Sequence, residues 1–205
     1  MATYPNLSKG EGLIRTHELF DQLYSDVNNA FEILENSKES QYLRRTLVRT
    51  VFSFIEGVIN ILKFEICSEY RLGKTKSSLT KKEREVLYET KERNGEKIKI
   101  FIATDTNLKK TFNIAKKAWN LKNYQFNSGG SEFEHFLKAK RARDKLTHPR
   151  TFYDVEISDV DMAYMASSFL WVKNEFHSLM SERVKKISEG LPDDIRTKLL
   201  NKSMA

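Results

Sequence analysis

The sequence predicts an all-α fold, and three observations support this prediction. Apolar residues recur three and four positions apart over several long stretches, which is the spacing of a helix with one buried face. The 205 residues include only 3 Pro and 8 Gly, so few positions interrupt a helix. The chain is 40% hydrophobic and 31% charged, a composition that excludes a collagen-like, low-complexity or wholly disordered protein.

Two long helices are expected near the start of the chain. The stretch Leu13–Leu34 carries apolar side chains at helical spacing, and the segment from Gln41 to about Leu72 is apolar on most of its circumference, which is typical of a central, buried helix. The polar exceptions in the second segment follow one narrow stripe, formed by Arg45, Arg49, Glu56, Asn60 and Lys63. Because polar groups on a buried helix need partners, we expect these side chains to be paired.

Residues 73–130 are expected to form an insertion of shorter elements. These are a helix from a capping box at Thr80–Glu83 to about Thr90, a turn at Asn94–Gly95, a short strand over 97–103 and a helix over Asp105–Trp119. The positive charge is concentrated in the middle of the chain, because residues 74–122 carry a net +8 and residues 123–150 a net +3. The flanking ranges 1–73 and 151–205 carry −2 each.

Such a basic segment has two interpretations. It can be the electrostatic footprint of a phosphate backbone, in which case the candidate RNA contacts are Lys109, Lys110, Lys116, Lys117 and Arg150. It can equally be a solvated lysine-rich surface, and the charge alone favours that simpler interpretation.

Two further helices are expected toward the end of the chain. One begins at Ser131 and stops before Pro149, and the other begins near Ser158, capped by Asp161, and ends at about Ser188. Residues 189–205 follow as a short terminal helix or a tail. The length of 205 residues and the mass of 24.0 kDa favour a single domain over 1–205, with one core and an insertion.

A cytoplasmic location is expected. Cys67 is the single cysteine, which excludes an intramolecular disulfide, and the first residues lack the basic and apolar regions of a secretory signal. The most apolar run, Val51–Leu62, contains Glu56 and has 12 residues, fewer than the roughly 20 that span a bilayer. We therefore expect no membrane partner.

Several common sites are excluded by spacing. Gly73-Lys74-Thr75 resembles part of a phosphate-binding loop, but Ser68 stands where the motif needs its first glycine. The four histidines have no ligand-spaced Cys or second His, and no serine-hydrolase elbow occurs. We therefore expect no metal and no other cofactor.

The remaining candidate is Arg143 with His148, near the end of the helix that begins at Ser131. Five helical steps would place the two side chains about 140° apart, but Pro149 disfavours helical geometry at His148 and lets the imidazole turn back. An arginine and a titratable imidazole suit chemistry on a phosphodiester. The alternative, a surface ion pair and a helix C-cap, is equally compatible with the spacing alone.

The context of this motif resembles the HEPN superfamily (higher eukaryotes and prokaryotes nucleotide-binding). The segments that carry the resemblance are RRTLVRTVFSFIEGVINILK (Arg44–Lys63), FEHFLKAKRARDKLTHPR (Phe133–Arg150) and SSFLWVKNEF (Ser167–Phe176). It implies an antiparallel four-helix core at about 12–72 and 131–188, with the basic, mainly helical insertion between core helices two and three. The family motif is an arginine, a polar residue, a spacer and a histidine, which Arg143, Asp144 and His148 match. Toxins of one subgroup carry a tyrosine two residues after the histidine, where this chain has Arg150.

The resemblance implies a metal-independent endoribonuclease that cleaves single-stranded RNA by attack of its 2′-OH, usually as a homodimer that brings two motifs together. Many members act in toxin–antitoxin or antiphage defence, so a cognate antitoxin or nucleotidyltransferase is an expected partner. The alternative is a non-catalytic helical module that binds a nucleotide or a protein. A third possibility is a regulatory subunit that binds acidic partners through its basic insertion.

In the catalytic interpretation His148 acts as general base or acid and Arg143 stabilises charge on phosphorus. Asp144 would orient one of them. Glu56 is expected to be a buried partner of Arg143 or Arg49, with Asn60 beside it, and a purely structural ion pair is equally compatible with its sequence position.

Overall fold

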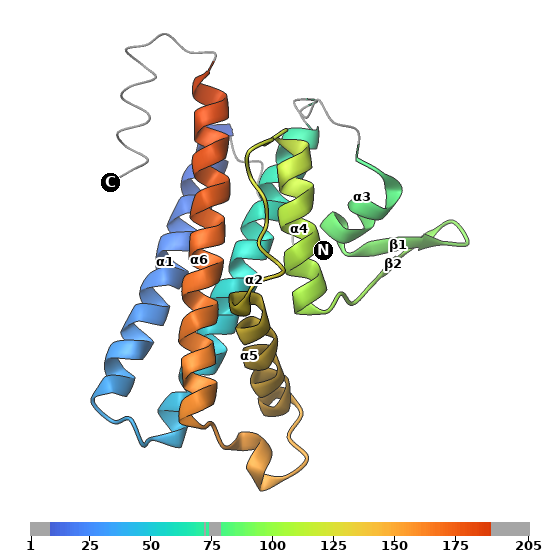
Figure 1. The fold of residues 1–205 in the computed structure, drawn as a ribbon. Helices are drawn as coiled ribbons and strands as arrows, with labels where there is room; N and C mark the ends of the chain where they lie inside the picture. The colour runs from blue at the N-terminus through green and yellow to red at the C-terminus, as the bar shows by residue number, and fades with distance from the viewer. Residues whose placement is uncertain (1–8, 72, 74–78, 190–205) are drawn as a thin grey trace. The chain divides into compact units, whose positions relative to one another are not determined.

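The structure is a computed structural model that describes residues 9–71, 73 and 79–189, with side chains from residue 18 onward. The described residues form mainly helices (Figure 1). The elements are α1 (Lys9–Glu35), α2 (Gln41–Arg71), α3 (Lys81–Tyr88), β1 (Thr90–Arg93), β2 (Glu96–Lys99), α4 (Thr104–Ala118), α5 (Ser131–Thr147), the 3-10 helix η1 (Phe152–Val155) and α6 (Asp159–Ser188). The predicted helical class is confirmed. Of the expected tail, residues 190–205 lie outside the described residues.

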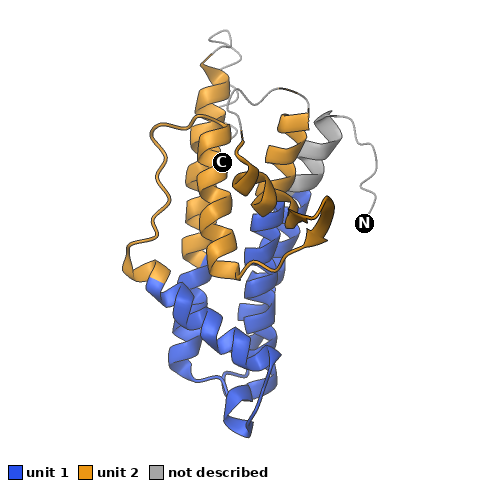
Figure 2. Ribbon diagram, turned by 90° about the vertical axis from the view of Figure 1, so that its right-hand side faces the viewer, with its two compact units in different colours: residues 1–61, 134–169 blue, residues 62–133, 170–205 orange. Residues whose placement is uncertain are grey.

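By its internal packing the chain divides into two compact units (Figure 2). Unit 1 comprises residues 1–61 and 134–169, and unit 2 comprises residues 62–133 and 170–205. Across the described part of the chain, no helix has both the length and the apolar character needed to cross a membrane.

The core of unit 1 is built on aromatic side chains of α1, α2 and α6. The rings of Phe54 and Phe169 meet edge to face with centroids 5.0 Å apart, and Phe20 packs on Phe54 at 5.5 Å. These pairs bury large apolar areas in preferred ring geometries. Gly57 of α2 faces the end of the Leu23 side chain of α1, which a Cβ atom at this position would displace.

The polar stripe of α2 is only partly buried. Arg49 and Asn60 are exposed, and Arg45 and Glu56 are half-buried. Of the five, Lys63 alone is buried, and its ammonium lies 2.8 Å from the Glu89 carboxylate within unit 2. The expected pairing is found for Arg45, Glu56 and Lys63, whereas within unit 1 this side of α2 reaches solvent.

Unit 2 contains a β-hairpin that the sequence indicated only in part. The capping box of Thr80 and Glu83 is confirmed, but α3 ends at Tyr88, and Glu89 adopts a left-handed conformation with φ 49°. Thr90–Arg93 then pairs with Glu96–Lys99 across the predicted Asn94–Gly95 turn. Nearly every hairpin residue is exposed, so no apolar alternation marks the first strand.

A buried ionic cluster stabilises unit 2. Arg183 of α6 is 5% exposed, and its guanidinium lies 3.0 Å from Glu65 and 2.6 Å from Glu69, both on α2. The same group covers the face of Trp119 at 4.0 Å from the ring centroid. Arginine suits this position because its planar group can form ion pairs and stack at the same time.

Candidate active site

Helix α5 carries the candidate motif in its last turns. Phe136, Ala139, Ala142 and Leu146 form its buried face. The backbone N–H of His148 still donates to the carbonyl of Asp144, at 3.2 Å, so the helical bonding continues one residue beyond Thr147. Pro149 has no N–H to continue it, and the predicted end of the helix is confirmed.

The Arg143 guanidinium is held from three sides. Its Nη2 donates to Oε1 of Glu56 at 2.6 Å, its Nη1 donates to Oδ1 of Asp144 at 3.2 Å, and the group lies 5.7 Å from the centroid of the Phe52 ring. Lys140 also donates to Asp144, at 3.0 Å. The sequence left Arg143 and Arg49 as alternative partners of Glu56, and the structure pairs Glu56 with Arg143.

The expected burial of Glu56 is wrong. Its side chain is 45% exposed, that of Asp144 is 44% exposed and that of Arg143 is 29% exposed. Glu56 stands on the side of α2 where Ser53 and Asn60 are exposed, so water reaches the carboxylate beside its arginine. The pair therefore orients Arg143 without isolating it from solvent.

Arg143 borders a cavity of about 290 Å³ between α2 and α5 within unit 1. The lining comprises Val48, Arg49, Phe52, Ser53, Glu56, Arg143, Leu146 and Thr147. Two arginines and the Glu56 carboxylate thus share this lining with the apolar side chains of Val48, Phe52 and Leu146. Guanidinium groups bind phosphate and carboxylate through paired N–H donors, so this cavity can accept an anionic group.

His148 lies outside this lining. Its side chain is exposed, and among the residues that the structure describes none forms a hydrogen bond with the imidazole. The expected return of the imidazole to the arginine is not found at this cavity. The His148 N–H keeps a helical bond to Asp144, and five steps of a regular helix separate two side chains by about 140°.

The other candidate residues are spread over both units. Asn60 is exposed in unit 1, and Arg150 is exposed while its backbone N–H donates to Asp154 at 2.9 Å. The four lysines belong to α4 of unit 2: Lys109 and Lys110 are exposed, Lys116 is half-buried, and Lys117 binds the Glu83 carboxylate at 2.8 Å. Of the candidate residues named from the sequence, the site in unit 1 therefore contains Arg143, Glu56, Asp144 and Arg49.

Phe52 is a member of this site that the sequence analysis did not single out. It stands four residues before Glu56, so one helical turn places both side chains on the same side of α2. The available signal was its spacing of four residues from Glu56, which belongs to the polar stripe. Phe52 lies in a hydrophobic run, however, and an aromatic side chain in such a run is normally assigned to the core.

Comparison with protein-family models, with curated proteins and with solved structures finds no match for this chain. Within the described ranges, no three His, Cys, Asp or Glu side chains gather in a way that could hold a metal ion.

Proposed function

We propose that this protein is a HEPN-type endoribonuclease with an antiparallel four-helix core, which cleaves single-stranded RNA in the cytoplasm without a metal ion. Its motif is Arg143, Asp144 and His148. We further propose that it acts as a homodimer in a toxin–antitoxin or antiphage system, beside a cognate antitoxin or nucleotidyltransferase.

One observation carries this proposal: the fixed orientation of Arg143 at the border of an anion-accepting cavity. The guanidinium has five N–H donors, of which the bonds to Glu56 and Asp144 use two. Donors therefore remain for a phosphate oxygen. A donor that is already oriented stabilises developing charge without reorganisation during the reaction.

The proposed reaction is a transesterification. His148 takes the proton of a ribose 2′-OH, the 2′ oxygen forms a bond to phosphorus, and the bond from phosphorus to the 5′ oxygen breaks. Arg143 stabilises the charge on the phosphorane oxygens. The leaving 5′ oxygen takes a proton from a second imidazole, and a two-fold dimer would supply that imidazole from another copy of the chain. The products are a 2′,3′-cyclic phosphate and a 5′-hydroxyl.

The test is incubation of the purified full-length protein with RNA, with Arg143→Ala and His148→Ala as the inactive variants. Each should abolish cleavage while changing the free energy of unfolding by about 1 kcal/mol or less, because both side chains reach solvent. Arg93→Ala and His177→Ala are matched controls on exposed positions of unit 2. Normal cleavage by a folded His148→Ala variant would refute the assignment.

The chemistry has its own test. Cleavage should persist in excess EDTA, spare DNA of the same sequence and stop when the 2′-OH at the cut site is replaced by hydrogen. Products with 5′-phosphates would refute the mechanism even for a genuine ribonuclease. The dimer is tested by light scattering, where a fully active monomer would exclude the two-copy site.

One observation favours the alternative, a non-catalytic module that binds a nucleotide or a protein partner. The imidazole of His148 is absent from the cavity that Arg143 lines. In that alternative Arg143 and Arg49 bind a phosphate group, and His148→Ala leaves nucleotide affinity unchanged.

A further inference from the structure

The solvent side of α4 is polar and carries no carboxylate beyond the first turn of the helix. At 100° per residue, six side chains fall within about 120° of the helix circumference: Thr106, Lys109, Lys110, Asn113, Lys116 and Lys117. None of the six is buried, whereas Leu108, Phe112 and Ala115 on the opposite side lie in the core of unit 2. The whole stretch 106–131 contains five lysines and no Asp or Glu. Positive charge is therefore gathered on one side of one helix.

Most of these lysines have no partner within the fold. Four ammonium groups form no ion pair or hydrogen bond with any residue that the structure describes: those of Lys109, Lys110, Lys116 and Lys122. Lys117 differs, because its ammonium binds the Glu83 carboxylate at 2.8 Å. The free positive charge of this face thus comes from the other four.

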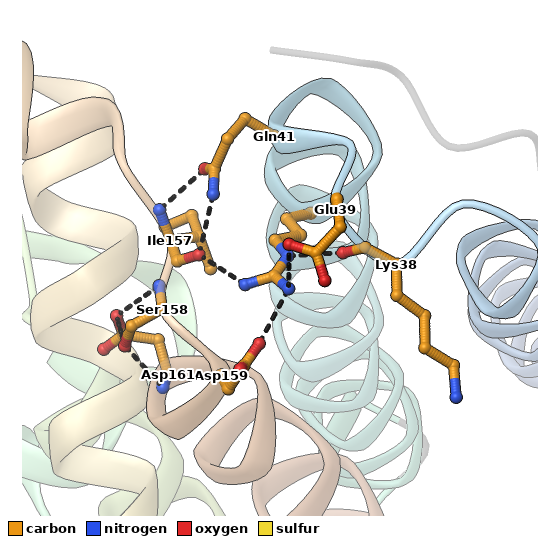
Figure 3. A network of polar contacts seen from close by, with 8 residues as sticks. Lys38, Glu39, Gln41, Ile157, Ser158, Asp159 and Asp161 are labelled. Carbon is orange, nitrogen blue, oxygen red and sulfur yellow. Dashed lines mark hydrogen bonds and ion pairs between the residues drawn. The ribbon is translucent and has the colours of Figure 1, made fainter.

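Cations elsewhere in the chain are paired with carboxylates. On α6, Lys185 binds Glu182 at 2.9 Å, and the adjacent Lys186 has its own carboxylate at 3.1 Å. At the start of α2, Arg44 pairs with Asp159 at 2.7 Å within the network of Figure 3. A carboxylate three or four residues away is the common way to stabilise a lysine on a helix surface. The face of α4 lacks this arrangement.

Local helix energetics do not account for this charge. The helix dipole favours cations in the last turn, which explains Lys116 and Lys117. Lys109 and Lys110 stand in the first half of α4, where the dipole does not favour them. Asp105 in the first turn is half-buried and accepts from a neighbouring hydroxyl at 3.3 Å. A ligand that supplies negative charge therefore provides what the fold does not.

The composition of the face indicates the class of ligand. Over residues 102–131, all of which the structure describes, no large apolar side chain is exposed, and the exposed Phe101 stands before α4 begins. Protein interfaces need buried aromatic or apolar anchors and are poor in lysine, and a membrane-bound helix needs an exposed apolar face. A phosphate backbone needs cations and N–H donors. The face of α4 supplies both, because the Asn113 amide lies between two pairs of lysines.

We propose that this face of α4 binds the phosphate backbone of single-stranded RNA. The residues that bind it are Lys109, Lys110, Asn113, Lys116 and Lys122. This inference rests on the proposed function, because it names the surface that holds the same RNA substrate. The seven residues from Lys109 to Lys116 rise about 10 Å along the helix, the length of about three stacked nucleotides at 3.4 Å each. Phosphate contacts carry no sequence information, so binding here does not depend on the bases.

The test measures RNA binding separately from cleavage. The probe is a fluorescent 2′-O-methyl dodecauridylate, which lacks the attacking hydroxyl, and its affinity is measured by anisotropy over a series of KCl concentrations. Each phosphate that a lysine neutralises on a single strand contributes about 0.7 to the slope of log affinity against log salt. Lys109→Gln with Lys110→Gln should therefore reduce this slope by about 1.4 and weaken binding about 10- to 30-fold at 0.1 M salt.

The last turn of α6 offers a matched control. Lys185→Gln with Lys186→Gln removes the same two charges from adjacent exposed positions of a helix in unit 2. It should change the affinity by about twofold or less, because charges remote from the bound strand are screened by salt. Lys109→Arg with Lys110→Arg keeps both charges and should keep wild-type affinity. Glutamine and arginine both favour helices, so all three variants should melt like wild type.

Wild-type affinity and salt slope in the Lys109 and Lys110 glutamine variant would overturn the proposal. An equal loss in the α6 variant would also overturn it, since net charge alone would then act. An acidic dodecapeptide that binds more tightly than the RNA, and loses this affinity in the α4 variant, would assign the face to an acidic protein instead. A protein that binds RNA through α4 but never cleaves it would refute the proposed function and leave this surface intact.

Discussion

Replacing Glu56 by glutamine tests how the site orients its arginine. The substitution keeps an oxygen that can accept from Arg143 but removes the negative charge of an ion pair 2.6 Å long. The side chains are 45% and 29% exposed, so solvent screens their attraction. We therefore expect a loss of about 1 kcal/mol in the free energy of unfolding, against the roughly 3–5 kcal/mol of a buried pair. In a chain of this size that corresponds to a melting temperature about 2 to 4 °C lower.

The effect on RNA cleavage should be larger than the effect on stability. Without the carboxylate the guanidinium is held by Asp144 at 3.2 Å and by the Phe52 ring, and it samples other orientations. A displacement of about 1 Å can lower a rate roughly 100-fold, so we expect cleavage to fall about 10- to 100-fold. Asp144→Asn is a comparison within the motif, because this carboxylate is equally exposed and forms the longer bond to the same guanidinium.

Single-turnover cleavage and thermal melting are measured on the same preparations. In an Arg143→Ala background, Glu56→Gln should have no further effect on cleavage, because the two residues act through one interaction. Unchanged cleavage by Glu56→Gln, in a protein that His148→Ala inactivates, would refute the positioning role of Glu56. A stability loss of about 3 kcal/mol or more would refute the solvent screening on which the magnitude depends.

Two further predictions concern unit 2. Arg183→Met removes the guanidinium that pairs with the buried carboxylate of Glu65. At about 3–5 kcal/mol, and about 2 to 4 °C for each kcal/mol, this change should lower the melting temperature by about 6 to 20 °C. Lys185→Met, at an exposed position of the same helix, is its control, and equal shifts would contradict the burial of the cluster. Burial raises the pKa of Glu175, which accepts from the Tyr124 hydroxyl at 2.7 Å. The native state then binds the proton more tightly than the unfolded chain, so this group's contribution to stability falls as pH rises through the folded pKa. The stability difference between Glu175→Gln and wild type should therefore favour the variant more at pH 7 than at pH 4. A difference in melting temperature that does not change with pH would contradict the raised pKa.

The helices could be predicted because their signals are local. The ends of α5 and α6 follow from Pro149 and from the Ser158–Asp161 capping box, which acts within four residues. The first hairpin strand was not predicted because it has no such local signal. Thr90–Arg93 is polar and forms a strand by pairing with Glu96–Lys99. A strand without an apolar face leaves no periodic signal.

The sequence by itself determined which residues are chemically able to act and approximately where α2, α5 and α6 begin and end. An arginine and a histidine near a proline-terminated helix end, and a carboxylate within an apolar run, are properties of order along the chain. Tertiary structure decided their partners and their exposure: Glu56 pairs with Arg143 rather than Arg49, its carboxylate reaches solvent, and His148 lies outside the cavity. These outcomes depend on how α2 and α5 pack across 87 residues of sequence. Helical periodicity gives the direction of a side chain from its own axis, whereas burial and pairing depend on the neighbouring element.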